Sequence, residues 1–376
     1  MTHLLQIVAA LWWGLALAIL AASFLAALFH VPGRYAHGDI SRPVSAIVPI
    51  KYWNAQLEDD LASLFSQDYA QFEVLLTAQE DNSLAMDAVR QVQARFPAVP
   101  SRILRSDVAL AASPKLNNLW NAIGGAAHDL ILTIDSNVRL APGDLEHLVR
   151  HHESGVGLVS TISITAAPQS LGAWIETSIV NCYHGRMLML ASVLGQGVGC
   201  GKIMMFRRDD LDRAGGLPGL AWAIGEDEAM QQAFARIGLR TVLSDRTSGQ
   251  VLGRRTLREV WQRQLRWVLI WRLQTPAVFV GDFLASALPA SLAASLAAPL
   301  FDMAPWAATV ETLALWCVLE MLLCRIKGWP LSPWAPFHLV GRECLVMAAR
   351  LRALTTRDVM WGGVRRRVAR RQRLAA

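Results

Sequence analysis

The sequence of 376 residues is poor in cysteine, and its cysteines form no recognisable framework. There is no Cys-x-x-Cys pair and no spacing typical of a zinc site. An odd number of cysteines without a pattern favours reduced thiols in a reducing compartment, with packing as their ordinary role. The chain also has no internal repeat and no low-complexity linker, so nothing divides its middle part into separate modules. The five cysteines are Cys182, Cys200, Cys317, Cys324 and Cys344.

Apolar residues make up 53% of the chain, with fourteen tryptophans and a mean hydropathy of +0.30, which is high for two soluble domains. From Leu4 to Leu28 the polar side chains are Gln6 and Ser23. This run exceeds the roughly 20 residues that cross a bilayer, so residues 1–33 are predicted to form an N-terminal transmembrane helix. A signal peptide is the alternative. No basic residue precedes the run and no small-x-small cleavage site ends it.

Two further apolar segments, Ala277 to Phe301 and Trp306 to Leu323, predict a C-terminal membrane hairpin over residues 275–326. Asp282, Glu311 and Glu320 interrupt them. Because isolated acids are costly at membrane depth, these side chains should face a protein interior or the interface. A buried helical hairpin, or a pair of helices lying half in the interface, remains open.

The last part of the chain, residues 327–376, is predicted to be an interfacial segment with a basic cytoplasmic tail. From Arg325 onward there are twelve Lys and Arg against two acids, and the remaining residues carry a net charge of −4. Beside apolar segments, such a tail favours contact with anionic lipid over nucleic acid, and no nucleic-acid partner is predicted. Basic residues after both membrane regions predict that the middle of the chain faces the cytoplasm, at the inner or plasma membrane if the chain is bacterial.

Residues 34–274 alternate short β-rich runs with amphipathic segments, which is typical of one cytoplasmic α/β domain. The predicted strands are Val44 to Ile50, Phe72 to Ala78, Ser101 to Leu104, Asp129 to Ile134, Gly157 to Ile164 and Ile203 to Phe206. The predicted helices are Leu57 to Phe65, Ser83 to Phe96, Leu116 to Ala127 and Asp144 to His152.

Polar side chains follow the predicted strands where ligands collect in an open α/β sheet. Lys51 follows the first strand, Glu80 and Asp81 the second, and Asp135 and Asn137 the fourth. A lysine and several acids at one edge suit a nucleotide diphosphate with a divalent cation. Ordinary strand-end turns are the alternative, because Asp and Asn are favoured there in any case.

Five motifs, in the right order, make the chain resemble glycosyltransferase family 21, the ceramide glucosyltransferases and their bacterial relatives. The resemblance runs from about Lys51 to Trp267. The motifs are Gln67-Asp68-Tyr69 with Phe72-Glu73-Val74, Pro114-Lys115-Leu116-Asn117-Asn118-Leu119, Asp135-Ser136, Asp209 to Gly216 leading to Glu226-Asp227, and Arg263-x-x-Arg266-Trp267.

The resemblance implies a GT-A fold, a Rossmann-like mixed sheet flanked by helices, and an inverting transfer of a sugar from UDP to a lipid hydroxyl. It implies Asp227 as the general base, with Glu226 as the second choice, because a carboxylate must take the hydroxyl proton. Arg263 and Arg266, followed by Trp267, are expected to stabilise the leaving diphosphate. A basic amphipathic helix on a membrane surface would give the same pattern over Thr256 to Gln274, and both roles can hold together.

Other residues of the matched motifs have two interpretations each. Lys115 and Asn117 are predicted to contact the nucleotide or sugar, with the start of a helix as the alternative. His184 is predicted to orient the acceptor or a phosphate, and a purely structural histidine is equally consistent with the sequence. Trp174, Trp222 and Trp261 are expected in core packing, although they could line a lipid channel.

The sequence departs from the family at two acidic motifs. Glu80-Asp81 replaces an expected Asp-Asp, and Asn137 takes the last place of an Asp-x-Asp triplet. An amide oxygen can bind a cation but adds no charge. We therefore expect Mg²⁺ or Mn²⁺ at Asp135 and Asn137, as an implication of the resemblance.

The favoured function is glucose transfer from UDP-glucose to ceramide, giving a β-glycolipid. A hopanoid or diacylglycerol acceptor is the first alternative, because the motifs concern the binding of the nucleotide-sugar donor and say little about the lipid. A processive polysaccharide synthase shares the aspartates and the Arg-Trp signature but uses more membrane helices. A non-catalytic nucleotide- or lipid-binding membrane protein is the third alternative. The sequence predicts no oligomeric state.

Overall fold

The computed structural model describes residues 2–30, 39–51, 53–78, 83–361 and 364–368. Its contacts divide the chain into two compact units. Unit 1 comprises residues 1–30, 165–190 and 252–376, and unit 2 comprises residues 31–164 and 191–251. The predicted catalytic domain, residues 34–274, contributes to both units, and the four predicted domains stay a prediction.

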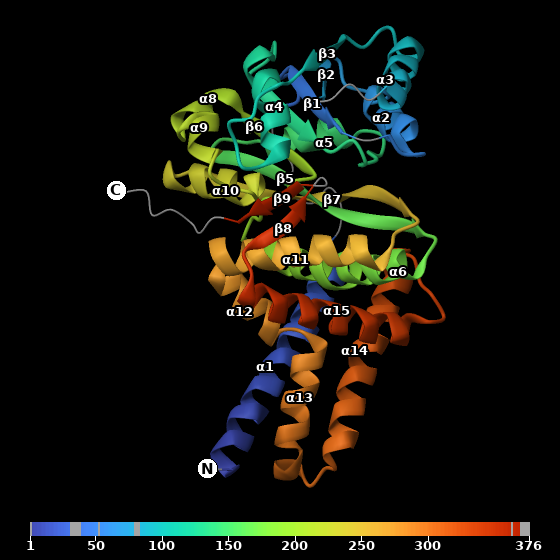
Figure 1. The fold of residues 1–376 in the computed structure, drawn as a ribbon, viewed down its shortest axis with the longest axis vertical. Helices are drawn as coiled ribbons and strands as arrows, with labels where there is room; N and C mark the ends of the chain where they lie inside the picture. The colour runs from blue at the N-terminus through green and yellow to red at the C-terminus, as the bar shows by residue number, and fades with distance from the viewer. Residues whose placement is uncertain (1, 31–38, 52, 79–82, 362–363, 369–376) are drawn as a thin grey trace. The chain divides into compact units, whose positions relative to one another are not determined.

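Unit 2 is built on a seven-stranded sheet with the order β3-β2-β1-β4-β6-β5-β7 (Figure 1). Strands β3, β2, β1 and β4 are parallel, whereas β6 runs antiparallel to both β4 and β5. The sheet is therefore mixed, as the predicted GT-A fold requires. The strands are β1 (Val44–Ile50), β2 (Phe72–Ala78), β3 (Ser101–Arg105), β4 (Leu130–Ile134), β5 (Val156–Pro168), β6 (Ile203–Arg207) and β7 (Arg240–Gly253).

Helices cover both faces of this sheet, because alternate strand residues point to opposite sides. Ala46 and Val48 belong to one apolar cluster, and Ile47 between them belongs to the other. Helices α2 (Leu57–Phe65), α3 (Ser83–Arg95) and α5 (Asp144–His151) pack on the first face. Helices α4 (Pro114–Gly125), α8 (Arg208–Arg213), α9 (Gly216–Leu220) and α10 (Glu226–Arg236) pack on the second. Each fully buried Leu or Ile of these clusters contributes about 1.5–3 kcal/mol.

The structure confirms the predicted strands and helices of this region to within a few residues. Strand β7 was not predicted. Its sequence, with Ser244, Asp245, Arg246 and Thr247 at the centre, lacks the apolar alternation of a strand with one buried face. Strand β7 joins the sheet by pairing with β5, and no local sequence pattern predicts this pairing.

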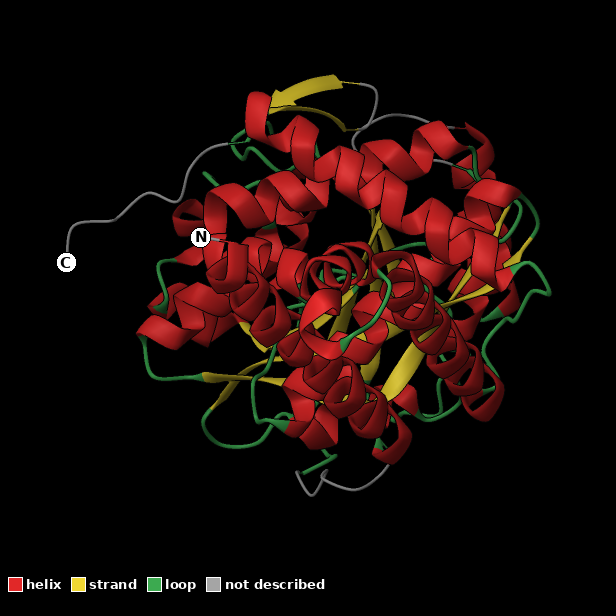
Figure 2. Ribbon diagram, turned by 90° about the horizontal axis from the view of Figure 1, so that it is seen from below, coloured by secondary structure: helices red, strands yellow, loops and turns green. Residues whose placement is uncertain are grey.

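The described part of unit 1 is mainly helical, with the two-stranded ribbon of β8 and β9 and the last residues of β5 and β7. Helices α1, α13 and α14 lie side by side, and Figure 2 views them from the end where α13 leads into α14. The indole N–H of Trp12 donates to the Leu284 carbonyl at 3.0 Å, and that of Trp13 donates to Thr312 Oγ1 at 3.1 Å. The elements are α1 (Thr2–Phe29), α6 (Leu171–Thr177), the π-helix η1 (Ser178–Gly185), α7 (Arg186–Val193), α11 (Leu257–Gln274), α12 (Pro276–Leu284), α13 (Ala287–Ala297), η2 (Ala298–Phe301), α14 (Pro305–Lys327), α15 (Ala335–Thr355), β8 (Asp358–Trp361) and β9 (Val364–Arg367).

Two of these helices, over His3–Phe29 and Pro305–Lys327, are long and apolar enough to cross a membrane. Helix α12 (Pro276–Leu284) and the continuous segment of α13 and η2 (Ala287–Phe301) are together long and apolar enough to cross a membrane. They are bent by 56° at the break between them. The N-terminal span is thus confirmed by length and composition, and the C-terminal region supplies one span or two.

Acidic residues of the C-terminal apolar segments are paired inside unit 1. Glu320 accepts hydrogen bonds from Arg342, the closer at 2.9 Å, and both side chains are buried. Asp282 accepts from Arg350 Nε at 3.0 Å. Glu311 is exposed. The prediction that isolated acids face a protein interior is therefore confirmed for Glu320 and Asp282.

Candidate active site

Four charged side chains of unit 2 meet beside the carboxyl end of β4. Lys115 Nζ lies 2.7 Å from Asp135 Oδ1 and 3.5 Å from Glu226 Oε1, and it also donates to the Gly201 carbonyl. Asp227 follows Glu226 directly. The structure thus brings together Lys115, Asp135, Glu226 and Asp227, which the sequence predicted as site residues from three separate motifs.

The start of α4 positions Lys115. Ser113 is the N-cap, and its hydroxyl accepts from the Leu116 N–H at 3.3 Å, while Pro114 occupies the first helical position. The same hydroxyl donates to Glu226 Oε2 at 3.0 Å. Because one buried serine serves both contacts, the start of α4 and the start of α10 are held together at the site.

Asp227 is fixed by two backbone donors. Its Oδ2 accepts from the Gly201 N–H and its Oδ1 from the Glu228 N–H, each at 2.9 Å. A Cβ added to Gly201 would lie 3.0 Å from Asp227 Oδ2 and 3.3 Å from Glu226 Oε1, so only glycine lets this loop approach both carboxylates. Gly201 therefore bridges Lys115 and Asp227 through its own peptide groups.

Burial shifts the pKa values of the charged groups in the cluster. Burial raises the pKa of Asp227, against hydrogen bonds from the Glu228 and Gly201 N–H groups that lower it. Burial also raises the pKa of Glu226, while Lys115 opposes the shift. For Lys115, burial lowers the pKa, but Asp135 and Glu226 outweigh it and hold the pKa above its usual value. The Lys115 ammonium is therefore charged throughout the physiological range.

Asp135 and Asn137 have the ligand chemistry of a divalent-cation site. The turn after β4 presents them two residues apart, and the Asp135 carboxylate keeps about a third of its surface exposed. Asn137 Oδ1 is buried and accepts no hydrogen bond from the residues that the structure describes. A carboxylate and an amide oxygen without a hydrogen-bond partner, two residues apart in one turn, are oxygen donors of the kind that Mg²⁺ and Mn²⁺ prefer.

The other predicted nucleotide contacts of unit 2 have varied positions. Lys51 is exposed at the end of β1. Asn117 uses its amide on the Ala111 backbone, accepting from the N–H at 2.6 Å and donating to the carbonyl at 2.9 Å. It therefore braces the loop before α4. Glu80 and Asp81 lie outside the described residues.

His184 belongs to unit 1, where it lies on the π-helix η1. Its ring packs against Trp267 and Trp271 of α11, with centroids 5.3 and 5.4 Å away. Burial lowers the pKa of His184 to about 4, so the imidazole is neutral at pH 7. π-Helical segments within helices are often found at functional sites. The predicted role in orienting the acceptor stays a prediction.

The Arg-Trp motif also belongs to unit 1, on α11. A capping box begins this helix, in which the Thr256 hydroxyl accepts from the Glu259 N–H and the Glu259 carboxylate accepts from Thr256. Arg263 forms an ion pair with Glu176 of α6, whose side chain is 1% exposed. The guanidinium of Arg266 lies 4.5 Å from the centre of the Trp361 ring. Both arginines thus have partners inside unit 1.

Replacing Arg263 with Met is expected to lower the free energy of unfolding by about 1–3 kcal/mol, because Glu176 is left buried beside the more distant Arg255. Adding Glu176→Met should restore stability, since a buried ion pair replaced by apolar groups is often neutral. Thermal unfolding in detergent measures both effects. Unchanged stability in the single variant would contradict the ion-pair argument. Turnover of the double variant separates the roles, because a diphosphate contact would remain lost.

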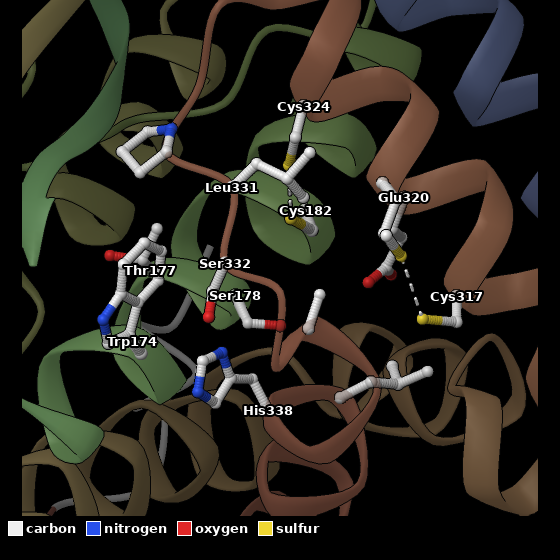
Figure 3. A pocket seen from close by; sticks show the side chains of 14 residues that line it. Trp174, Thr177, Ser178, Cys182, Cys317, Glu320, Cys324, Leu331, Ser332 and His338 are labelled. Carbon is white, nitrogen blue, oxygen red and sulfur yellow. Dashed lines mark hydrogen bonds between the residues drawn. The ribbon is translucent and has the colours of Figure 1, made fainter.

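A small cavity of about 30 Å³ lies within unit 1, between α6 and η1 on one side and α14 and α15 on the other (Figure 3). Trp174 stacks on His338 at its wall, with ring centroids 5.5 Å apart. Cys182 and Cys324 approach to 3.3 Å between their sulfur atoms. None of the predicted catalytic residues lines it, and we assign it no step of a reaction.

Sequence reasoning missed three residues that shape these sites: Ser113, Gly201 and Glu176. A serine before Pro-Lys at a helix start is a visible N-cap signal for Ser113. Nothing local marks Gly201 or Glu176, because their partners lie 26 and 87 residues away in the chain.

Comparisons with known proteins identify a family and a similar fold. A family model described as "Glycosyl transferase family 21" matches residues 10–374. Ceramide glucosyltransferase 1 of Caenorhabditis elegans is 25% identical over 252 residues, covering 66% of this chain and 54% of the relative. Ceramide glucosyltransferase of Komagataella phaffii is 28% identical over 158 residues, covering 39% of this chain and 30% of the relative. The chain thus spans about half the length, or less, of these relatives.

Among solved structures, a mannosyltransferase from Pyrobaculum calidifontis in complex with GDP-Man and Mn²⁺ has a similar fold. The TM-score is 0.57 at 16% identity, with 93% of this chain and 99% of that chain covered. This likeness bears on the fold alone, and it confirms the predicted GT-A architecture.

Proposed function

Because the chain belongs to glycosyltransferase family 21, we propose that it is a membrane-bound inverting glycosyltransferase. It moves a sugar, glucose in the favoured case, from a UDP-sugar to the hydroxyl of a membrane lipid, with ceramide as the favoured acceptor. The observation that carries the proposal is the cluster of Lys115, Asp135, Glu226 and Asp227 in a chain with membrane-length helices.

Asp227 is the general base of the proposed reaction. The lipid hydroxyl oxygen attacks the anomeric carbon from the face opposite the diphosphate, the bond from that carbon to the UDP oxygen breaks, and the hydroxyl proton passes to Asp227. A carboxylate held by two backbone N–H groups has a fixed orientation for this transfer. Its raised pKa strengthens it as a base. Glu226 is engaged by Ser113 and Lys115, which supports the choice of Asp227.

Lys115 and Asp135 belong to the donor side of the proposed site. Asp135 and Asn137 would hold a divalent cation, which neutralises the charge that develops on the leaving diphosphate. Lys115 orients the Asp135 carboxylate through the 2.7 Å contact. The predicted diphosphate roles of Arg263 and Arg266, and the nucleotide roles of Lys51, Glu80 and Asp81, remain part of the proposal on the strength of the motifs.

We place unit 2 on the cytoplasmic side of the membrane. Basic residues follow α1 and α14, and basic residues near the ends of spans stay in the cytoplasm. The tail with Arg365, Arg366 and Arg367 would then meet anionic lipid. A cysteine introduced in unit 2 and probed with a membrane-impermeant reagent tests this: labelling in sealed right-side-out cells would contradict the proposed orientation.

The decisive assay incubates the detergent-purified chain with a panel of UDP-sugars and, separately, ceramide, diacylglycerol and a hopanoid polyol. The expected result is UDP release that requires both UDP-glucose and ceramide. Release with another lipid would keep the transferase and replace the acceptor. A long polymer as product would favour a polysaccharide synthase, and UDP binding without turnover on any acceptor would favour a non-catalytic binding protein.

The pH dependence of kcat/KM should report the raised pKa of Asp227. Activity is lost as the pH falls through this pKa. The acid limb of the pH–activity profile is therefore expected at a pH above 3.8, the ordinary pKa of an aspartate. Glu228→Gln removes a negative charge that raises this pKa, and it should move the limb to lower pH while the plateau stays unchanged. Asp212→Asn, an exposed acid on α8, is the matched control and should leave the limb in place. A limb that Glu228→Gln does not move would argue against Asp227 as the titrating base.

A further inference from the structure

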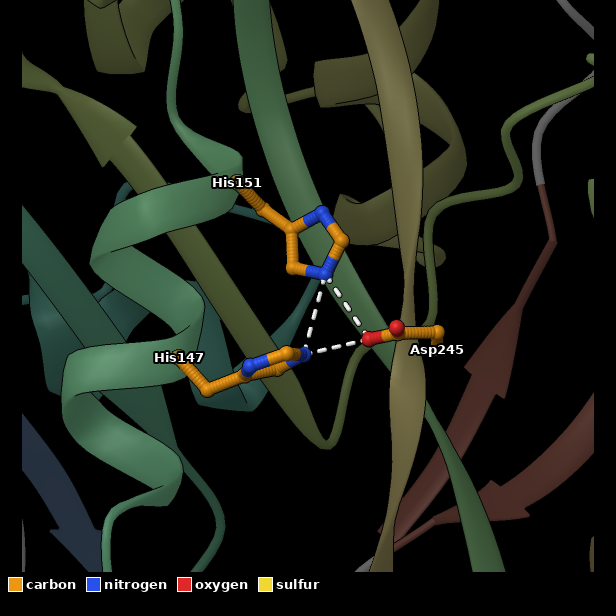
Figure 4. A group of neighbouring side chains, drawn as sticks. All are labelled: His147, His151 and Asp245. Atoms are coloured by element: carbon orange, nitrogen blue, oxygen red, sulfur yellow. Dashed lines mark hydrogen bonds and ion pairs between the residues drawn. The ribbon is translucent and has the colours of Figure 1, made fainter. Parts of the chain in front are cut away.

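Two histidines of α5 and one aspartate of β7 form a buried cluster in unit 2 (Figure 4). His147 and His151 are one helical turn apart, so both rings leave the same face of α5. Asp245 reaches them from β7. The exposed fractions of the three residues are 6%, 4% and 4%. The cluster shares no residue with the candidate active site.

The three facing atoms are close to one another in every pair. His147 Nε2 and His151 Nε2 are 3.2 Å apart, and His151 Nε2 lies 3.0 Å from Asp245 Oδ1. His147 Nε2 also contacts Asp245 Oδ1. In Figure 4 the two ring nitrogens and the carboxylate oxygen point toward one common place.

No placement of protons satisfies all three contacts. If both Nε2 atoms carry hydrogen, both donate to Asp245, and the contact between the nitrogens sets two donors against each other. If one Nε2 is bare, its lone pair faces the carboxylate oxygen. At most two of the three contacts are favourable in either state, and the third sets like groups against each other at close range.

A divalent cation satisfies the three contacts together. Two imidazole nitrogens at about 2.0–2.1 Å from a tetrahedral Zn²⁺ lie about 3.3 Å from each other, close to the 3.2 Å observed. Two histidine nitrogens favour Zn²⁺ over Mg²⁺, which prefers oxygen. The ion would also neutralise the buried Asp245 carboxylate.

We propose that His147, His151 and Asp245 bind one Zn²⁺ ion that fastens α5 to strand β7. Because β7 is the last strand of the sheet order, it has a single neighbouring strand. The ion would add to its other contacts, the Arg246–Asp144 ion pair with α5 and the backbone pairing of Gly249 with Arg139. The role is structural. The site differs from the proposed nucleotide cation at Asp135 in its ligands and in its location on the chain.

His152 provides a matched control on the same helix end. Its Nδ1 faces Arg42 Nη1 at 3.2 Å, away from the cluster atoms. His152 is likewise buried, with 3% of its surface exposed. His152→Gln therefore removes an imidazole without removing a proposed ligand.

The test measures the metal content of the full chain, purified in detergent through a tag without histidine and dialysed against a weak chelator. Elemental analysis is expected to give one Zn²⁺ per chain for the unmodified protein, for His152→Gln and for Asp135→Asn, and less than a tenth of that for His147→Gln and His151→Gln. Exchange of the unmodified protein into Co²⁺ should give the visible absorption of a tetrahedral site. A strong chelator should lower the thermal unfolding midpoint, and Zn²⁺ should restore it.

Several results would overturn the proposal. Unmodified protein that neither retains Zn²⁺ nor gives the Co²⁺ spectrum would show that the cluster shares protons. Zn²⁺ retained in both histidine variants, or lost in Asp135→Asn alone, would place the ion elsewhere. If a histidine variant does not fold, the unmodified protein and its Co²⁺ spectrum still decide. Metal content is independent of sugar transfer, so this test can fail while the proposed function holds.

Discussion

Asp227→Asn is expected to lower lipid-dependent turnover by about 100- to 10,000-fold while UDP-sugar binding is retained. The carboxamide cannot take the acceptor proton, and positioned proton transfer contributes a rate factor of this size. Binding should survive because Asp227 contacts Gly201 and Glu228, whereas Asp135 and Lys115 form the donor side of the site. Initial rates with saturating UDP-sugar, and UDP-sugar binding by calorimetry, measure the two effects separately.

The amide has a structural cost that the experiment must separate from the chemical one. Both Asp227 oxygens accept backbone N–H groups, and an asparagine can accept only one of them. The loss of one such bond is worth about 0.5–1.5 kcal/mol, too little to unfold the chain by itself. Glu228→Gln is the control, because it replaces the carboxylate of the next residue in the same helical turn with an amide. This variant should keep the turnover of the unmodified protein at the pH where activity is maximal.

Glu226 is the competing base, and its variant decides between the two carboxyls. Glu226→Gln keeps the hydrogen bond from Ser113 but weakens the attraction for Lys115. We expect weaker UDP-sugar binding and a smaller loss of turnover than in Asp227→Asn. Normal turnover in Asp227→Asn, with loss in Glu226→Gln, would show that the base was misassigned.

The sequence predicted the members of the cluster but not their arrangement. Asp135 could be placed because ligands collect where parallel strands end. Lys115, Glu226 and Asp227 came from the family resemblance, since no periodicity links Lys115 to carboxylates 20 and 111 residues further along the chain. The contact of Ser113 with Glu226 spans 113 residues and depends on how α4 and α10 pack on the same face of the sheet. Local patterns carry no information on such packing.

The histidine cluster also could not be predicted from the sequence alone. The spacing of His147 and His151 is visible in the sequence, but paired histidines on a helix are common without a ligand role. Their meaning depends on Asp245, 94 residues beyond His151, on a strand whose polar centre gave no strand signal. Likewise, Arg263 was predicted from its motif, whereas its partner Glu176 lies on α6, which the sequence did not predict.

Lys115→Met is expected to lower the free energy of unfolding by about 3–5 kcal/mol at neutral pH, the cost of leaving a buried carboxylate without its cation. The Lys115 side chain is 12% exposed and that of Glu226 is 7% exposed, so water replaces little of the lost interaction. Thermal unfolding followed by tryptophan fluorescence in detergent measures the change. Arg105→Met, which removes an exposed cation at the end of β3, is the control and should leave stability unchanged.

The pH dependence of this deficit identifies its cause. Burial raises the pKa of Glu226 and Lys115 opposes the shift, so the methionine variant has the higher Glu226 pKa in the folded state. A folded state that binds more protons than the unfolded chain loses stability as pH rises through the raised pKa. Below the ordinary value of 4.5 the carboxyl is protonated in both states, so its contribution vanishes there. The deficit should therefore grow with pH above that value. Adding Glu226→Gln should remove most of it, because the double variant has no unpaired Glu226 charge. A deficit that is constant with pH would instead indicate lost packing of the lysine side chain.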